Sequence, residues 1–237
     1  MKKTEETKKP FTVLLAGNPN VGKSTVFNAL TGMRQHTGNW TGKTVSTAKG
    51  SFREKGSDFE LVDLPGTYSL SAHSKEESVA RDMICFGKYD AVAVVCDATT
   101  LERCLVLVLE TLEVTNKVVV LVNLIDEAKK KKIRIRCDKL SEILKVPVIP
   151  ASARSNKGLD EFRRAIDKMC RDKREYEPVF SYEDAIESAF AEDKVSIQTA
   201  DVIDAIKDTH SLSEIMKDAL EKMTKEYESR KFKSASK

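Results

Sequence analysis

The sequence has no long hydrophobic run and no strong excess of charge. Its longest apolar stretches, residues 91–96 and 118–122, are far shorter than the ~20 residues that span a bilayer. The charged start, "MKKTEETKKP", is not followed by the apolar segment of a signal peptide. The 40 basic and 37 acidic residues leave a net charge of +3, which argues against a nucleic-acid partner. We therefore expect the chain as given to be soluble.

Cysteine, histidine and tryptophan are also scarce. The five cysteines include no C-x-x-C pair, which favours reduced, inert thiols in a cytosolic chain over a disulfide framework. The three histidines share no metal-ligand spacing, which argues against a zinc or iron site built from them. The only tryptophan, Trp40, stands in "TGNWTGKTVS" (37–46), a polar stretch that predicts a loop. The basic run "KKKK" (129–132) predicts a solvated surface.

Apolar, β-branched runs alternate with helix-like segments up to about residue 172. This alternation predicts an α/β domain with a mostly parallel six-stranded sheet, in which a hairpin adds one antiparallel edge strand. The expected strands are residues 11–17, 45–52, 59–63, 90–97, 117–123 and 146–152. The expected helices are residues 23–32, 74–87, 99–114, 137–144 and 158–170.

The pattern changes in the charged stretch 171–178. Beyond it, apolar residues from Leu212 to Tyr227 keep a spacing of three and four, which predicts an amphipathic helix. We therefore expect a flexible start, an α/β domain, a small all-helical domain and a polar tail, at residues 1–9, 10–172, 173–230 and 231–237.

The stretch "GNPNVGKS" (17–24) has the form G-x-x-x-x-G-K-[ST] and lies between a predicted strand and a predicted helix, which is the context of a phosphate-binding P-loop. Its backbone N–H groups would cradle phosphates at the helix N-terminus, Lys23 would reach the β- and γ-phosphates, and the Ser24 hydroxyl would bind Mg²⁺. The expected nucleotide contacts are Gly17, Asn18, Pro19, Asn20, Val21, Gly22, Lys23, Ser24 and Thr25.

Two further motifs follow strand ends. "DLPG" (63–66) has the D-x-x-G form of a GTPase: Asp63 would hold the Mg²⁺ hydration shell, and the Gly66 N–H would bind a γ-phosphate. "NLID" (123–126) would recognise guanine, because the Asp126 carboxylate can accept two guanine N–H donors. The usual form is N-K-x-D, and Leu124 replaces its lysine. "SAR" (152–154) is similar to a loop whose N–H meets guanine O6. The expected contacts here are Asp63, Leu64, Pro65, Gly66, Asn123, Leu124, Asp126, Ser152, Ala153 and Arg154.

With these four motifs in order, the chain resembles the TRAFAC class of G proteins, with a Ras-like sheet. Over about residues 10–170, stretches such as "GNWTGKTV", "DLPGTYSL" and "DATTLERCLVLVLETLE" are similar to the N-terminal G domain of the FeoB family of ferrous-iron transporters. The resemblance implies a slowly hydrolysing regulatory GTPase at the cytoplasmic face of the cell membrane. It also implies a GDI-like helical domain and, in the full-length polypeptide, a membrane transport domain. Whether small cytosolic subunits of the transport system bind to it, and whether it forms an oligomer, stays open.

The resemblance makes residues 33–47 and 63–75 the two switch segments. It implies that Thr44 binds Mg²⁺ in the GTP state, that Gly42 and Lys43 contact the nucleotide, and that Lys23, Thr44 and Gly66 serve catalysis. Lys43 departs from the usual valine. Trp40 would be a partly exposed residue of the first switch.

The resemblance also implies that Asn20 binds K⁺. Thr67 stands where Ras-like enzymes have the glutamine that orients water, so a monovalent cation could supply the missing charge. The alternative is that Asn20 only shapes the loop.

Two other functions stay open. A soluble GTPase acting on RNA or ribosomes would share the P-loop, but it usually carries a different first switch and a basic appendage. A non-catalytic, nucleotide-gated binding module is the third hypothesis.

Overall fold

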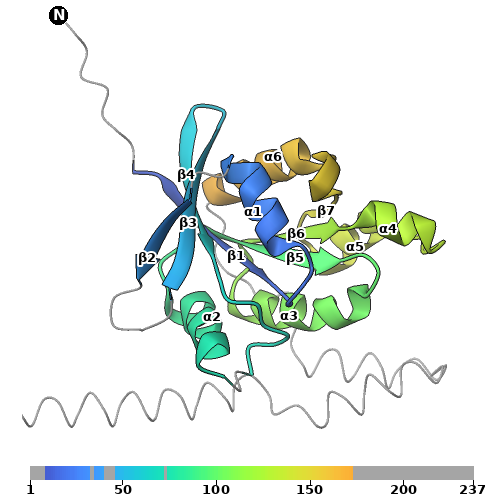
Figure 1. Ribbon diagram of the computed structural model, residues 1–237, viewed down its shortest axis with the longest axis horizontal. Helices are drawn as coiled ribbons and strands as arrows, with labels where there is room; N and C mark the ends of the chain where they lie inside the picture. The colour runs from blue at the N-terminus through green and yellow to red at the C-terminus, as the bar shows by residue number, and fades with distance from the viewer. Residues whose placement is uncertain (1–8, 33–34, 40–45, 72–73, 173–237) are drawn as a thin grey trace, which may run out of the picture. The chain divides into compact units, whose positions relative to one another are not determined.

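The computed structural model of the chain describes residues 9–32, 35–39, 46–71 and 74–172 (Figure 1). A seven-stranded sheet with the order β2-β3-β4-β1-β5-β6-β7 forms the centre of this part of the chain. Its strands are β1 (Phe11–Gly17), β2 (Gln35–Asn39), β3 (Ser46–Glu54), β4 (Ser57–Asp63), β5 (Ala91–Asp97), β6 (Val118–Asn123) and β7 (Val148–Pro150).

Five of the strands are parallel to one another. β1 pairs with β4 and β5, β5 with β6, and β6 with β7, all in parallel. β6 is buried along its whole length, and β5 is buried up to its last residue, as expected for a parallel sheet covered on both faces. The mixed α/β sheet predicted from the sequence is therefore confirmed.

The structure adds one strand, β2, to the six predicted. Gln35–Asn39, which we expected to belong to the first switch loop, pairs antiparallel with β3 from Gln35↔Gly50 to Asn39↔Ser46. β3 is also antiparallel to β4, so the strand that runs against the others lies one place in from the edge. The segment "QHTGN" has no apolar alternation, and only its backbone pairing with β3 makes it a strand.

Helices cover both faces of the sheet. α1 (Lys23–Thr31) and α6 (Leu159–Arg171) lie on one face, and α2 (Lys75–Phe86) and α3 (Leu101–Val114) lie on the other (Figure 1). α1 ends at Gly32, which has a left-handed φ of 62°, a conformation that glycine adopts without steric cost. α2 begins with a capping box, in which Ser74 and Glu77 bond each other's backbone N–H groups. α5 (Cys137–Leu144) packs beside β7.

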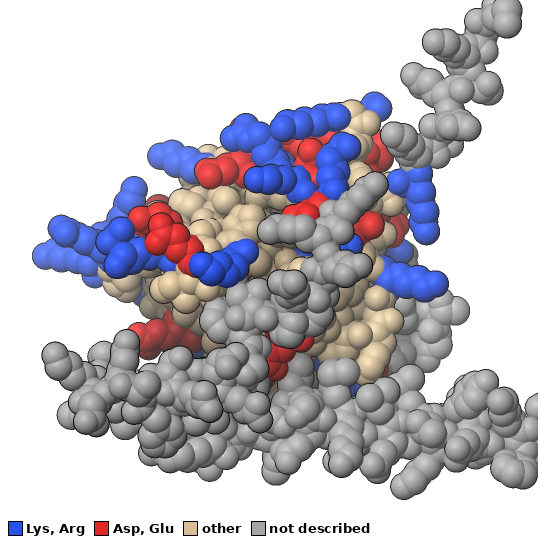
Figure 2. Space-filling model, turned by 180° about the vertical axis from the view of Figure 1, so that it is seen from behind, with Lys and Arg blue, Asp and Glu red and all other residues tan. Residues whose placement is uncertain are grey.

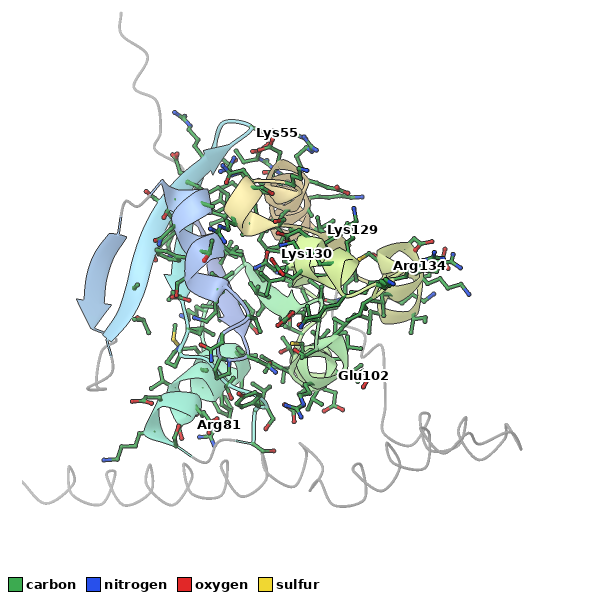
Figure 3. The ribbon with its side chains drawn as sticks, turned by 45° about the vertical axis from the view of Figure 1, so that its right-hand side comes forward. Lys55, Arg81, Glu102, Lys129, Lys130 and Arg134 are labelled. Carbon is green, nitrogen blue, oxygen red and sulfur yellow. The ribbon has the colours of Figure 1, made fainter. Side chains whose placement is uncertain are left out.

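The sequence did not predict α4 (Ile125–Lys130), which we read as the start of a basic stretch. Lys129, Lys130 and Arg134 extend into solvent from α4 and the turn after it (Figure 3), and Lys130 pairs with Glu127 at 2.8 Å. The solvated surface predicted for "KKKK" is therefore confirmed. On the face seen in Figure 2, Lys and Arg side chains are interspersed with Asp and Glu.

Several predictions fall on residues outside the described ranges. They concern Trp40, Gly42, Lys43, Thr44 and the whole of the predicted helical domain, 173–230. These stay predictions. Among the described residues, no helix is both long enough and apolar enough to cross a membrane.

Candidate nucleotide-binding site

The predicted motifs meet at one edge of the sheet. β1, β4, β6 and β7 run in parallel, so their carboxyl ends lie at the same edge, and the loop after each carries one motif. In open α/β sheets this edge is where ligands bind. The sheet topology therefore brings together segments more than a hundred residues apart in the sequence.

The two motif glycines of the P-loop are required by close contacts. A Cβ atom at Gly17 would lie 2.6 Å from the carbonyl oxygen of Val95, on β5. At Gly22, which precedes α1 with a φ of 85°, it would lie 2.5 Å from the amide nitrogen of Asn123. Any side chain at either position would push the P-loop away from its neighbours, so the loop can curl this tightly only with glycine.

Lys23 joins the P-loop to the D-x-x-G motif. Its ammonium group contacts the Asp63 carboxylate and donates a hydrogen bond to the Leu64 carbonyl oxygen at 2.6 Å. Burial raises the pKa of Asp63, and the charge of Lys23 opposes that shift. Ser24 follows Lys23 directly. A hydroxyl and a carboxylate oxygen therefore lie at the N-terminal end of α1, and oxygen ligands of this kind suit Mg²⁺.

The D-x-x-G segment lies against the P-loop. The Leu64 N–H donates to the Leu15 carbonyl at 3.0 Å, and the Thr67 N–H donates to the Gly17 carbonyl at 3.2 Å. A Cβ at Gly66 would lie 3.2 Å from backbone atoms of Pro19, so a larger residue would displace one loop from the other. Thr67 is fully buried, and its hydroxyl donates to the Ser69 carbonyl at 2.5 Å.

A buried carboxylate that the sequence analysis missed holds the segment after D-x-x-G. Glu110, on α3, is only 5% exposed and accepts a 2.5 Å hydrogen bond from the Leu70 N–H. Burial raises the pKa of Glu110 to about 7, although this hydrogen bond favours the ionised form. The sequence signal was a lone acidic residue inside the apolar run "LVLVLETL".

Asn123 connects three motifs through one carboxamide. Its Nδ2 donates to the Val21 carbonyl in the P-loop at 3.0 Å, and its Oδ1 accepts from the Ala153 N–H at 3.0 Å. Only 1% of Asn123 is exposed, so both bonds are sheltered from water. The side chain that we assigned to nucleotide contact is thus also the brace between the loops after β1, β6 and β7.

Asp126 lies in the first turn of α4, after Leu124, whose φ is 62°. The neighbouring Ser152 hydroxyl is the main cause that lowers the pKa of Asp126, so the group is ionised at neutral pH. Its Oδ1 is buried and has no hydrogen-bond partner within the described part of the chain. An acceptor in this position is suited to a ligand with N–H donors.

The other predicted contacts lie around this centre. Asn18 is buried, and its Nδ2 donates to the Arg103 carbonyl at 3.3 Å. Pro19, Asn20, Ser24, Thr25 and Arg154 are exposed at the same edge, while Val21 and Ala153 are buried. The structure does not describe Gly42, Lys43 and Thr44.

A mostly parallel α/β sheet with these motif loops at one edge is the fold and site of a P-loop GTPase. The family described as "Ferrous iron transport protein B" matches residues 11–166. The chain therefore belongs to the FeoB family, and the matched part is its N-terminal G domain, a GTPase domain. This membership does not favour the alternative of a GTPase acting in RNA modification or ribosome assembly.

Curated proteins with similar sequences belong to the same family. The Fe(2+) transporter FeoB of Escherichia coli (strain K12) is 43% identical over 164 residues, which are 68% of this chain and 21% of that protein. The corresponding protein of Salmonella typhimurium is 42% identical over the same share of each chain. The chain thus spans about a fifth of the length of these curated relatives.

Solved structures match the same region. The G domain of the T. maritima FeoB iron transporter is 42% identical, with a TM-score of 0.64, over 69% of this chain and 100% of that one. The FeoB G domain from Methanococcus jannaschii is 44% identical, with a TM-score of 0.62, over 70% and 100%. The cytosolic domain of T. maritima FeoB in a GDP form is 36% identical, with a TM-score of 0.69, over 79% and 77%.

Proposed function

We propose that this chain is the GTP-binding and slowly GTP-hydrolysing regulatory domain of a ferrous-iron membrane transporter. The observation that carries the proposal is the assembly of the motif loops around the N-terminus of α1, held by Asn123 and by the contact of Lys23 with Asp63. In the full-length polypeptide a membrane transport domain would accompany it, at the cytoplasmic face of the cell membrane. Small cytosolic subunits of the transport system would be further partners.

The phosphates would lie in the cradle of residues 17–25. Lys23 would turn from Asp63 to the β- and γ-phosphates, and the Gly66 N–H would bind the γ-phosphate. Ser24, Asp63 and, from the first switch, Thr44 would hold Mg²⁺, which neutralises phosphate charge. Gly42 and Lys43 would complete the contacts from that switch, which covers residues 33–47. The second switch would be residues 63–75.

Slow hydrolysis is proposed because Thr67 offers no side-chain base. Its hydroxyl is buried and already donates to the Ser69 carbonyl, so it cannot orient a water as a glutamine would. The attacking water would be held mainly by backbone groups of the D-x-x-G loop.

The guanine base would bind at Asp126, whose ionised carboxylate has an unpartnered, buried oxygen. The loop of Ser152, Ala153 and Arg154 would close over the base. The Ala153 N–H donates to Asn123, so we assign base selectivity chiefly to Asp126.

Asn20 would hold K⁺ beside the phosphates through its carboxamide oxygen. The residue is exposed in the P-loop and has a φ of 66°. Asn tolerates this left-handed conformation better than most residues, which also supports a purely loop-shaping role. The two roles differ in whether the carboxamide itself is needed.

The test is steady-state GTP hydrolysis in KCl and in NaCl at equal ionic strength, with Mg²⁺ present. Wild type should be several-fold faster in KCl, and removal of Mg²⁺ with a chelator should abolish turnover. Asn20→Gly keeps the backbone conformation but lacks the carboxamide, so its rate should be the same in both salts. Asn20→Asp keeps an oxygen ligand and should retain part of the KCl effect. Equal wild-type rates in KCl and NaCl would exclude the K⁺ role and leave Asn20 as a loop-shaping residue.

A further inference from the structure

Two cysteines meet beside the P-loop, where the sequence predicted only inert thiols. Cys96 lies near the carboxyl end of β5, and Cys104 lies in the first turn of α3. The Asp97 N–H donates to the Cys104 Sγ at 3.3 Å, which places the Cys104 sulfur against the backbone directly after Cys96. Both side chains are buried. The fold thus brings together two sulfur atoms that stand eight positions apart in the sequence.

The surroundings of the pair make the two thiols unequal. The hydrogen bond from Cys96, followed by those from the Asp97 N–H and the Thr100 hydroxyl, lowers the pKa of Cys104 to about 7 against the opposing effect of burial. The same thiol–thiol bond raises the pKa of Cys96. Since the thiolate is the reactive form, Cys104 is the nucleophile and Cys96 is the neighbouring thiol that can resolve it.

The other thiols of the described chain lack these features. Burial raises the pKa of Cys85 to about 11 and that of Cys170 to about 12, and it also raises the pKa of Cys137. These three fit the prediction of inert thiols. Cys85 is also only half-buried, so it is a suitable control for accessibility without reactivity.

The turn between β5 and α3 lies beside the Cys104 sulfur, since the Asp97 N–H at its start bonds that sulfur. Thr100, the residue directly before α3, is exposed. Glu102, in the same turn of the helix, is also at the surface (Figure 3). A small opening of this exposed turn would admit a molecule of the size of a peroxide to the buried sulfur.

The pair is coupled to the candidate nucleotide site through backbone bonds. The carbonyl of Arg103, directly before Cys104, accepts from Asn18 in the P-loop at 3.3 Å. The N–H of Ala98, two residues after Cys96, donates to the Asn123 carbonyl at 2.9 Å. Movement of the β5–α3 turn therefore acts on two residues of the site.

We propose that Cys96 and Cys104 form a reversible disulfide when the protein meets a peroxide, and that this bond weakens nucleotide binding at the P-loop. The second half of the proposal rests on the proposed nucleotide-binding function. An S–S bond is about 2 Å long, which is shorter than any non-bonded contact between two thiol groups. Its formation would draw the start of α3 toward β5 and shift the Arg103 carbonyl away from Asn18.

The chemistry balances with the peroxide as the oxidant. The Cys104 thiolate attacks one oxygen of hydrogen peroxide and breaks the O–O bond, which gives a sulfenic acid and a hydroxide that becomes water by taking a proton. The Cys96 sulfur then attacks the Cys104 sulfur, the S–S bond forms, and the sulfenic oxygen leaves as water with the Cys96 proton. The two thiols lose two electrons and two protons in all, and one peroxide becomes two waters.

The first test is peptide mapping of the folded wild-type chain. After treatment with hydrogen peroxide and alkylation of the remaining thiols, trypsin cleaves at Arg103, between the two cysteines. The disulfide then appears as peptide 89–103 linked to peptide 104–117, and dithiothreitol should separate them. The Cys85→Ser variant should give the same linked pair. Complete alkylation of Cys96 and Cys104 after peroxide treatment, or a linked pair that forms only in denaturant, would overturn the proposal.

The second test compares GDP affinity before and after oxidation. Oxidised wild type should bind GDP at least several-fold more weakly, with recovery in dithiothreitol, while Cys104→Ala should be insensitive to peroxide. An unchanged affinity in the disulfide form would overturn the coupling. Absence of GDP binding by the reduced protein would instead count against the proposed function, and peptide mapping would still decide whether the disulfide forms.

Discussion

Asn123 joins the P-loop to the loop after β7 through the two ends of one buried carboxamide. Its motif predicted a nucleotide contact, but the sequence could not tell that both ends of the side chain reach other loops. That depends on the sheet, which places Val21 and Ala153 on either side of β6. Asp126, in contrast, stands where its motif predicts, with an oxygen that no described group binds.

We expect Asp126→Ala to lose guanine selectivity. Its carboxylate can accept the N1–H and the 2-amino N–H of guanine, a pair of donors that adenine does not present. Loss of a charge-assisted hydrogen bond should weaken GDP binding about tenfold or more, while the weaker ADP binding should not change. Calorimetric titration with both nucleotides measures the difference.

Asp138→Ala is the matched control for this prediction. Asp138 is an exposed carboxylate whose pKa is also lowered, mainly by Arg136, and it lies in the first turn of a different helix, α5. Its removal should leave GDP affinity unchanged. Equal dissociation constants of the wild type for GDP and ADP would contradict base recognition by Asp126.

At the scale of elements, α3 is bonded to the segment after D-x-x-G through Glu110 and Leu70. The helix was predicted from its apolar spacing, and its bounds agree closely with the prediction. The role of Glu110 was not predicted, because a carboxylate in an apolar run reveals its partner only when the neighbouring segment packs against it. Glu113, on the same helix, also has a pKa raised to about 7, by burial and then by the charge of Glu110.

The raised pKa of Glu110 predicts a pH-dependent stability. Its pKa is about 7 in the fold against an ordinary 4.5, so between these values the folded state binds more protons than the unfolded chain. The free energy of unfolding should therefore fall as the pH rises from about 4.5 through 7, with a contribution of about 2 kcal/mol between pH 5.5 and 8. Urea denaturation at these two pH values measures it.

Glu110→Gln should reduce this dependence, because the amide can still accept the Leu70 N–H but does not ionise. It should not abolish the dependence, since Glu113 remains and contributes with the same sign. Glu102→Gln, at an exposed position of the same helix, should behave as wild type. A pH dependence in Glu110→Gln as large as in wild type would show that Glu110 does not titrate in this range.

At the scale of the whole molecule, the G domain should function without the predicted helical domain. The groups assigned to nucleotide binding all lie before Asp172, and the solved G domain of T. maritima FeoB matches this part of the chain over its entire length. A chain shortened to end at Asp172 should fold cooperatively and keep GTP turnover within about threefold of the full chain. Circular dichroism during heating provides the control for folding, and a folded short chain without hydrolysis would contradict this division.

The sequence by itself determined the order of the main elements and the identity of the four motifs. β1, β5, β6, α1, α3 and α6 were predicted at nearly their observed bounds. Their apolar periodicity and glycine punctuation are local properties, and so is the spacing within each motif. The residues that make up the candidate nucleotide-binding site could therefore be predicted from single segments of the sequence, taken in order.

The tertiary structure alone decided which segments meet. β2 is a strand because β3 lies beside it, since its own residues have no strand pattern. The Asn123 brace, the Glu110 bond to Leu70 and the Cys96–Cys104 pair each join groups on different elements. Such pairings arise from the sheet order and from the burial of one element against another. Because each of these interactions joins two different elements, the residue pattern within a single element does not reveal them.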